Sequence, residues 1–205
     1  MTSGRLQLRS WPEVFVIVGR MFSQDMLTVS QSKSIGRDEF TIAGGDGRVL
    51  GSARQTLKLS DLVKASRGVE VFDAAGNVVL VVEDPVNVIR DTYVIRRVDE
   101  QTGEKTELAH ITKRFAWLGA KYDVDIAGFP PVKIDGEVFQ LNYQLTADGR
   151  PIARVDAEYS GAGRALMGKT TYRIVFEPGL DDNVHAAVIG IAFALDMRRE
   201  KMRNS

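Results

Sequence analysis

Residues 181–203 read DDNVHAAVIGIAFALDMRREKMR, and this stretch decides the fold. Between Val184 and Leu195 the only polar residue is His185. Residues that cap helix N-termini precede the run and basic residues follow it, as the helix dipole favours. The pattern predicts a helix over about residues 182–203.

This helix is apolar on every side, so it must be surrounded by protein or by lipid. The twelve residues from Val184 to Leu195 span about 18 Å as a helix, against about 30 Å for the hydrocarbon of a bilayer. We therefore expect a helix enclosed in protein. Its small residues keep it slim, and we expect Val188, Gly190 and Phe193 to form its core contacts. Asp196 is expected to have a structural role, with a partner such as an arginine of the surrounding barrel that is argued for below.

Upstream, apolar and polar residues alternate between about residues 22 and 176, which is typical of many short strands. The clearest alternation predicts one strand over Glu137–Leu145, with Phe139 pointing inward. Five turn signals are expected at hairpin tips: residues 44–47, 73–76, 102–103, 135–136 and 148–149. A helical turn is expected at Ser60–Ser66.

About twelve strands of this kind should close, so we expect a mainly β protein, an antiparallel barrel around the C-terminal helix. The predicted organisation is an N-terminal extension over residues 1–20 and one barrel domain over residues 21–205. The extension is interpreted as packing across a barrel end or contacting another chain.

Composition excludes several classes of function. The chain has 205 residues, no cysteine and a formal net charge of zero. Disulfides and thiolate chemistry are therefore excluded, and a nucleic-acid partner is not expected. The apolar stretch over residues 14–18 is shorter than a signal-peptide core, so we expect a cytoplasmic protein, with the inner membrane face as a peripheral location.

The C-terminal segment also resembles a known family. Residues 176–182 (FEPGLDD) followed by residues 185–197 (HAAVIGIAFALDM) are similar to the C-terminal signature of phospholipid scramblases and LURP-one-related proteins. Residues 68–79, 40–47 and 139–161 resemble strand-turn-strand units of the same superfamily. The resemblance implies the tubby-like fold, a twelve-stranded barrel around a central helix.

The resemblance brings functional expectations as well. Tubby domains bind phosphoinositides, scramblases are associated with calcium-dependent lipid movement, and most LURP-one-related proteins have no assigned activity. This chain lacks the cysteine clusters and the proline-rich arm of scramblases. It also carries the basic segment Gly163–Lys169 where scramblases are acidic.

Few residues suggest a site. Asp181 and Asp182 are calcium candidates, but a calcium site needs six or more oxygen ligands, and N-capping is the favoured reading. Arg96, Arg97, Lys113 and Arg114 are candidates for binding anionic lipid headgroups. Because Glu100, Glu104 and Glu107 are interleaved with them, a solvated, charge-balanced surface is the alternative. His110 and His185 lack the context of a zinc site or a catalytic base.

These observations favour a non-catalytic module of the LURP-one-related kind that binds a protein or a small ligand, without a cofactor and without catalysis. The alternative is a peripheral membrane protein that binds anionic phospholipid or moves lipids between leaflets. The third class, an enzyme, is disfavoured because the helix fills the barrel interior and no catalytic motif is present.

Overall fold

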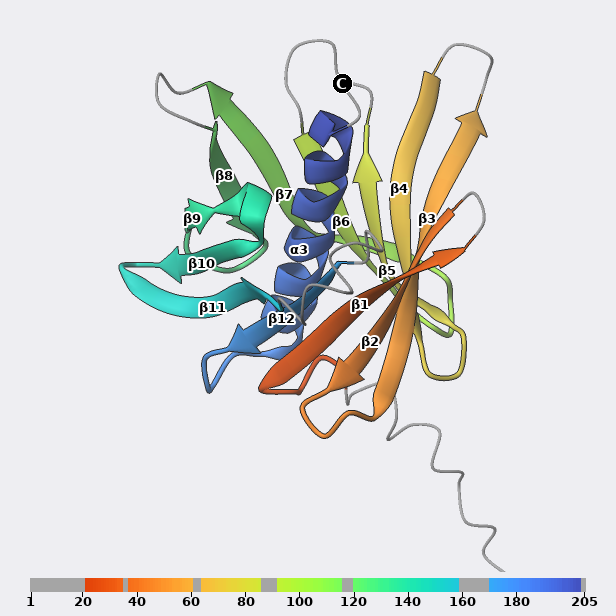
Figure 1. The fold of residues 1–205 in the computed structure, drawn as a ribbon, viewed down its shortest axis with the longest axis horizontal. Helices are drawn as coiled ribbons and strands as arrows, with labels where there is room; N and C mark the ends of the chain where they lie inside the picture. The colour runs from red at the N-terminus through yellow and green to blue at the C-terminus, as the bar shows by residue number, and fades with distance from the viewer. Residues whose placement is uncertain are drawn as a thin grey trace, which may run out of the picture.

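A closed antiparallel barrel surrounds one long helix (Figure 1). The structure is a computed structural model that describes residues 21–34, 37–60, 64–85, 92–115, 120–158 and 170–203. The extension over residues 1–20 lies outside the described residues. Each strand pairs with the next one along the chain, and β12 closes the sheet onto β1, where Met26 pairs with Val175 and Ser30 with Thr171. The predicted fold is confirmed.

The elements have the following bounds: β1 Met26–Ser34, β2 Arg37–Gly44, β3 Val49–Ser60, β4 Lys64–Asp73, β5 Val78–Asp84, β6 Thr92–Val98, β7 Lys105–Phe115, β8 Ala120–Ile126, β9 Val132–Glu137, the 3-10 helix η1 Val138–Gln140, β10 Asn142–Ala147, β11 Arg150–Ala157, β12 Thr171–Phe176 and α3 Asp182–Arg203. The predicted helix over residues 182–203 therefore has the bounds of α3.

Four of the five predicted hairpin tips are turns in the structure. The β10–β11 turn has only two residues, Asp148 and Gly149, with φ of 50° and 73°. Such a turn demands positive φ at both positions, which Asp tolerates and Gly adopts freely. In the β4–β5 turn the Asp73 carboxylate accepts hydrogen bonds from the backbone N–H groups of Ala75 and Asn77, at 2.9 and 2.8 Å.

The predicted strand over Glu137–Leu145 is right for residues 142–145, which belong to β10, and wrong for the residues before them. The 3-10 helix η1 interrupts it, and Asp135 and Gly136 lie within β9 instead of forming a turn. Leu141 takes the left-handed conformation, with φ of 53°, and its N–H bonds the Val138 carbonyl. Leu141, Tyr143 and Leu145 are buried as predicted, whereas Phe139, which lies in η1 and not in a strand, is 45% exposed and does not point inward.

The predicted helical turn at Ser60–Ser66 is also wrong. Strand β3 continues to Ser60, and β4 begins at Lys64, while residues 61–63 lie outside the described residues. The two strands stay paired through Ser60 and Lys64. Backbone hydrogen bonding between the strands therefore prevails over the local sequence, and β3 and β4 rise together beside the helix (Figure 1).

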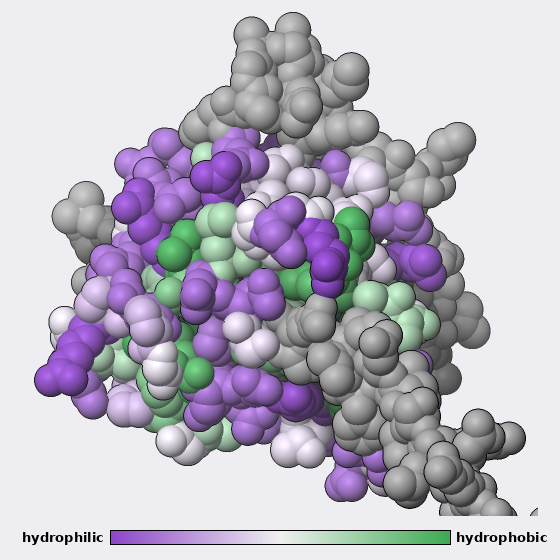
Figure 2. Space-filling view, turned by 90° about the horizontal axis from the view of Figure 1, so that it is seen from below, coloured by the Kyte–Doolittle hydropathy of each residue, from purple (hydrophilic) through white to green (hydrophobic). Residues whose placement is uncertain are grey.

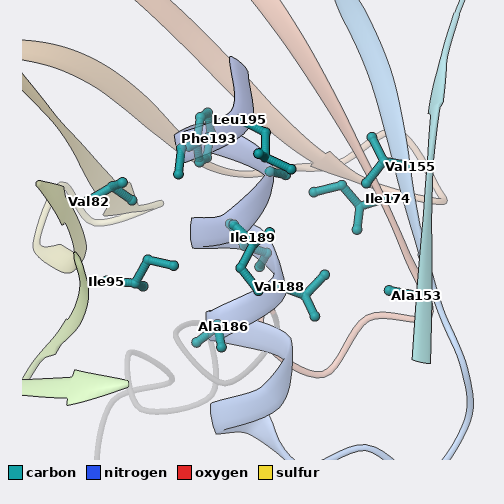
Figure 3. Packing of buried hydrophobic residues seen from close by; sticks show 14 of the residues in the cluster. Val82, Ile95, Ala153, Val155, Ile174, Ala186, Val188, Ile189, Phe193 and Leu195 are labelled. Atoms are coloured by element: carbon teal, nitrogen blue, oxygen red, sulfur yellow. The ribbon is translucent and has the colours of Figure 1, made fainter. Parts of the chain in front are cut away.

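The helix is enclosed over most of its length. Every residue from Val184 to Arg198 is buried, and side chains from strands on opposite sides point at α3 (Figure 3). Phe193 packs edge-on against Phe40 of β2, with ring centroids 5.4 Å apart. A Cβ at Gly190 would lie 2.5 Å from Cγ2 of Ile95 on β6. The absence of a side chain at Gly190 lets the helix and the barrel wall approach this closely.

We expect Gly190→Leu to lower the free energy of unfolding by roughly 1–3 kcal/mol or more, because the core has no room for the added carbons. Gly190→Ala should cost less, since Ala gains about 1 kcal/mol in helix propensity. Urea denaturation measures both. Gly45→Ala is the matched control, because its Cβ would meet only the terminal Met26 methyl, at 3.3 Å. Unchanged stability of Gly190→Leu would contradict a tightly enclosed helix.

Candidate functional site

A polar layer lies where α3 emerges from the barrel, directly after its apolar run. Asp196 is 2% exposed, and its Oδ1 lies 3.1 Å from Nη2 of Arg199. The same Nη2 donates a hydrogen bond of 2.7 Å to Oγ1 of Thr170, just before β12. The Arg199 guanidinium therefore neutralises a buried carboxylate and ties the helix to the barrel wall.

Glu200 extends the layer to β1, the neighbour of β12 in the sheet, and to β3. Its carboxylate accepts hydrogen bonds from Nε2 of Gln55 on β3 at 2.6 Å and from Nε2 of Gln31 on β1 at 3.4 Å. Gln31 is buried, and its Oε1 accepts a hydrogen bond of 3.4 Å from the N–H of Thr170. The end of α3 is thus held by side chains from β1 and β3 and by the residue before β12.

Burial shifts the titration of this layer. It raises the pKa of Asp196 to about 6, with Arg199 opposing the rise. Burial also raises the pKa of Glu200 to about 7; the bond from Gln55 opposes this, and the nearby Asp38 carboxyl adds to it. Burial raises the pKa of the Tyr143 and Tyr172 phenols, and Asp196 adds to both. The phenols stay neutral, whereas the two carboxyls change charge near neutral pH.

The opposite end of α3 carries the predicted calcium candidates. Oδ1 of Asp181 accepts hydrogen bonds from the N–H groups of Asn183 and Val184, both at 2.9 Å, which is the geometry of an N-cap. Asp182 lies in the first turn of the helix. Among the described residues, no group of three or more His, Asp or Glu side chains is placed to hold a metal ion. A calcium role for these two residues stays a prediction.

The four predicted lipid-binding residues do not form one patch. On β6, Arg96 forms ion pairs with Glu83 and with Glu107 of β7, the latter at 3.8 Å. The neighbouring Arg97 lies over the Phe22 ring, 4.8 Å from its centroid, and donates a hydrogen bond of 2.8 Å to Oδ1 of Asn183. The structure therefore places Arg97 at the N-terminal end of α3.

Lys113 and Arg114 lie at the other end of β7. Arg96 pairs with Glu107, and from Glu107 to Lys113 the strand rises about 20 Å at roughly 3.3 Å per residue. The backbone of Arg114 is described in β7, but its side chain lies outside the described residues. Arg96 and Arg97 therefore belong to different parts of the barrel from Lys113 and Arg114.

The partner of Asp196 differs from the prediction. It is Arg199 from the next turn of the same helix, and not a barrel arginine. Helix residues three apart face each other, so this pairing could have been read from the sequence. The contacts of Glu200 with Gln31 and Gln55 had no sequence signal, because they depend on how distant strands are placed around the helix.

These observations define a class of protein: the tubby-like fold, a closed twelve-stranded barrel around a buried C-terminal helix. The model of the LURP-one-related family matches residues 25–196, so the chain belongs to this family. A similar solved structure is an X-ray structure of a protein from Arabidopsis thaliana, 14% identical with a TM-score of 0.51. The match covers 88% of this chain and 98% of that one. No curated protein matches.

The N-cap at Asp181 predicts a loss of stability when its carboxylate is removed. We expect Asp181→Ala to lower the free energy of unfolding by roughly 0.5–2 kcal/mol, because two helix N–H groups lose their acceptor. Asp182→Ala is the matched control and should cost only about 0.3–1 kcal/mol, through the helix dipole. Thermal melting with calcium and with chelator measures both. A melting temperature that rises with calcium in the wild type but not in Asp181→Ala would favour the metal role.

The raised pKa values of Asp196 and Glu200 predict how the stability of the protein depends on pH. The folded state binds protons more tightly than the unfolded state at Asp196 and Glu200, since both pKa values are raised. Their contribution to stability is therefore full below about pH 4 and is lost as the pH rises through about 6 and 7.

We expect Glu200→Gln to gain stability relative to the wild type as the pH rises from about 5 to about 8. Glu137→Gln, an exposed carboxyl at the same end of the barrel, is the control. Urea denaturation across this range measures the difference. If the difference in free energy of unfolding between Glu200→Gln and the wild type does not change with pH, the pKa of Glu200 is not raised in the folded protein.

Proposed function

We propose that the protein is a non-catalytic binding module that engages a protein or a small ligand through its outer surface. The observation that supports this most is that the barrel interior is occupied by the chain's own helix, buried from Val184 to Arg198. Antiparallel barrels that carry a small ligand do so in an empty interior. Here side chains of α3 such as Val188, Ile189 and Phe193 occupy that space (Figure 3).

The polar layer supports a binding role over catalysis. Each of its described groups serves the attachment of α3: Arg199 to Asp196 and Thr170, and Glu200 to Gln31 and Gln55. A catalytic site needs a nucleophile or base within reach of an open space for substrate. Asp196 instead faces the helix's own arginine. Membership of the LURP-one-related family, given by the match over residues 25–196, assigns no reaction to the chain and so agrees with this proposal.

The alternative of lipid movement between leaflets gains no specific observation. Within the part of the chain that the structure describes, no helix has the length and hydropathy to cross a bilayer.

The test is titration with a fluorescent fatty acid, the class of ligand that an open barrel of this kind would hold. We expect no saturable binding to the wild type, because α3 fills the space. Phe193→Ala removes a side chain that is 1% exposed and serves as the positive control for an opened interior. If that variant does not fold, Phe193→Leu takes its place.

Hydrogen exchange locates any binding that does occur. Saturable one-to-one binding to the wild type, with exchange along α3 changed by the fatty acid, would overturn the proposal, because the interior would then be a ligand site. Protection confined to outward-facing strand segments would agree with binding at the outer surface.

A further inference from the structure

Buried tyrosines gather inside the end of the barrel where α3 finishes. Arg199 of α3 contacts Thr170, so β12 begins at that end, and the antiparallel order of the sheet makes β6, β8 and β10 begin there too. In each of these four strands the first buried side chain that the structure describes is a tyrosine, and none of the four is more than 6% exposed: Tyr93, Tyr122, Tyr143 and Tyr172.

Two of these tyrosines lie beside the Asp196 carboxylate of the polar layer. Strand β11 separates them, with Tyr143 of β10 paired with Val155 and Tyr172 of β12 paired with Ala157. Both side chains point toward the helix, and the charge of Asp196 adds to the rise in the pKa of both phenols. Two phenols and a carboxyl therefore meet between α3 and the wall formed by β10 and β12.

Several polar atoms of this group have no hydrogen-bond partner among the protein atoms described. They are the hydroxyls of Tyr143 and Tyr172, Oδ1 of Asp196 and Nε of Arg199. Figure 2 shows hydrophilic residues spread over an outer face of the molecule, where water reaches them. The group beside Asp196 lies inside the barrel, and a buried polar atom without a partner is costly. Folded proteins give such atoms a partner, which is ordered water where no protein group is in reach.

The chemistry of these atoms selects what can bind them. A phenol both donates and accepts, the Nε–H of Arg199 only donates, and an ionised Asp196 only accepts. An anion would lie beside the Asp196 carboxylate and a cation beside the Arg199 guanidinium, while an apolar molecule would leave every atom unpaired. A small neutral molecule that donates and accepts satisfies all of them, and water is the smallest.

We propose that ordered water molecules lie between Asp196 and the hydroxyls of Tyr143 and Tyr172, and that they attach α3 to β10 and β12. A buried water makes about three hydrogen bonds, so one or two molecules can bridge these groups. Glu200 is bonded directly to β1 and β3, and the waters add an attachment on another side of the helix. This inference does not depend on the proposed function.

A high-resolution crystal structure of the full chain tests where the waters lie. We expect electron density for at least one water within about 3.2 Å of a phenol oxygen and of the Asp196 carboxylate. Hydroxyls bonded directly to each other or to Asp196, with no water between them, would overturn the proposal. Density for a larger molecule would also overturn it and would make this group a ligand site.

Tyrosine-to-phenylalanine variants test whether the waters hold the helix. Tyr143→Phe and Tyr172→Phe remove only a hydroxyl, and each should lower the urea midpoint by roughly 0.2–0.7 M if that hydroxyl is bonded to water. The opposite sign is expected for a hydroxyl without a partner, because its removal relieves an unpaired buried group. A raised midpoint in both variants would therefore overturn the proposal.

The double variant tests whether the two hydroxyls share their waters. Tyr143→Phe with Tyr172→Phe should lose less stability than the two single losses added together, because one set of waters serves both. The control combines Tyr143→Phe with Ile42→Val, a buried apolar change on β2, and its losses should add. Strict addition in the tyrosine pair would contradict shared waters. Fatty-acid binding along α3 would contradict the proposed function and leave these results standing.

Discussion

The structure depends on one constraint: a helix that is apolar on every side must be covered on every side. A two-layer packing covers only one stripe of a helix, so the apolar run from Val184 to Leu195 requires a sheet that closes around it. The closed sheet in turn requires a slim helix, which explains the contact between Gly190 and Ile95. Barrel and helix thus have no separate core, and neither can bury its apolar surface without the other.

Where the apolar run ends, the helix is still enclosed, so burying a charged side chain there is unfavourable. The charged side chains at this point have partners. Asp196 is still inside the barrel, and Arg199 supplies the opposite charge at 3.1 Å. Glu200 is nearer to solvent and takes hydrogen bonds from neutral glutamines. Burial raises the pKa of both carboxyls; Arg199 opposes the rise at Asp196, whereas at Glu200 the bond from Gln55 opposes it and the nearby Asp38 carboxyl adds to it.

The sequence predicts the parts of this molecule that local rules decide. The helix over residues 182–203 and its cap at Asp181 follow from composition and order alone, and the barrel follows from the helix and the number of strands. The left-handed Leu141 does not follow, because Leu rarely adopts positive φ and nothing nearby announces it.

The basic residues show a second limit. Adjacent residues of a strand point to opposite faces, and the ends of a strand lie far apart, so a list of nearby bases is not a patch. Arg96 and Arg97 lie close to Lys113 in the chain, yet most of the length of β7 separates them from Lys113 in the barrel.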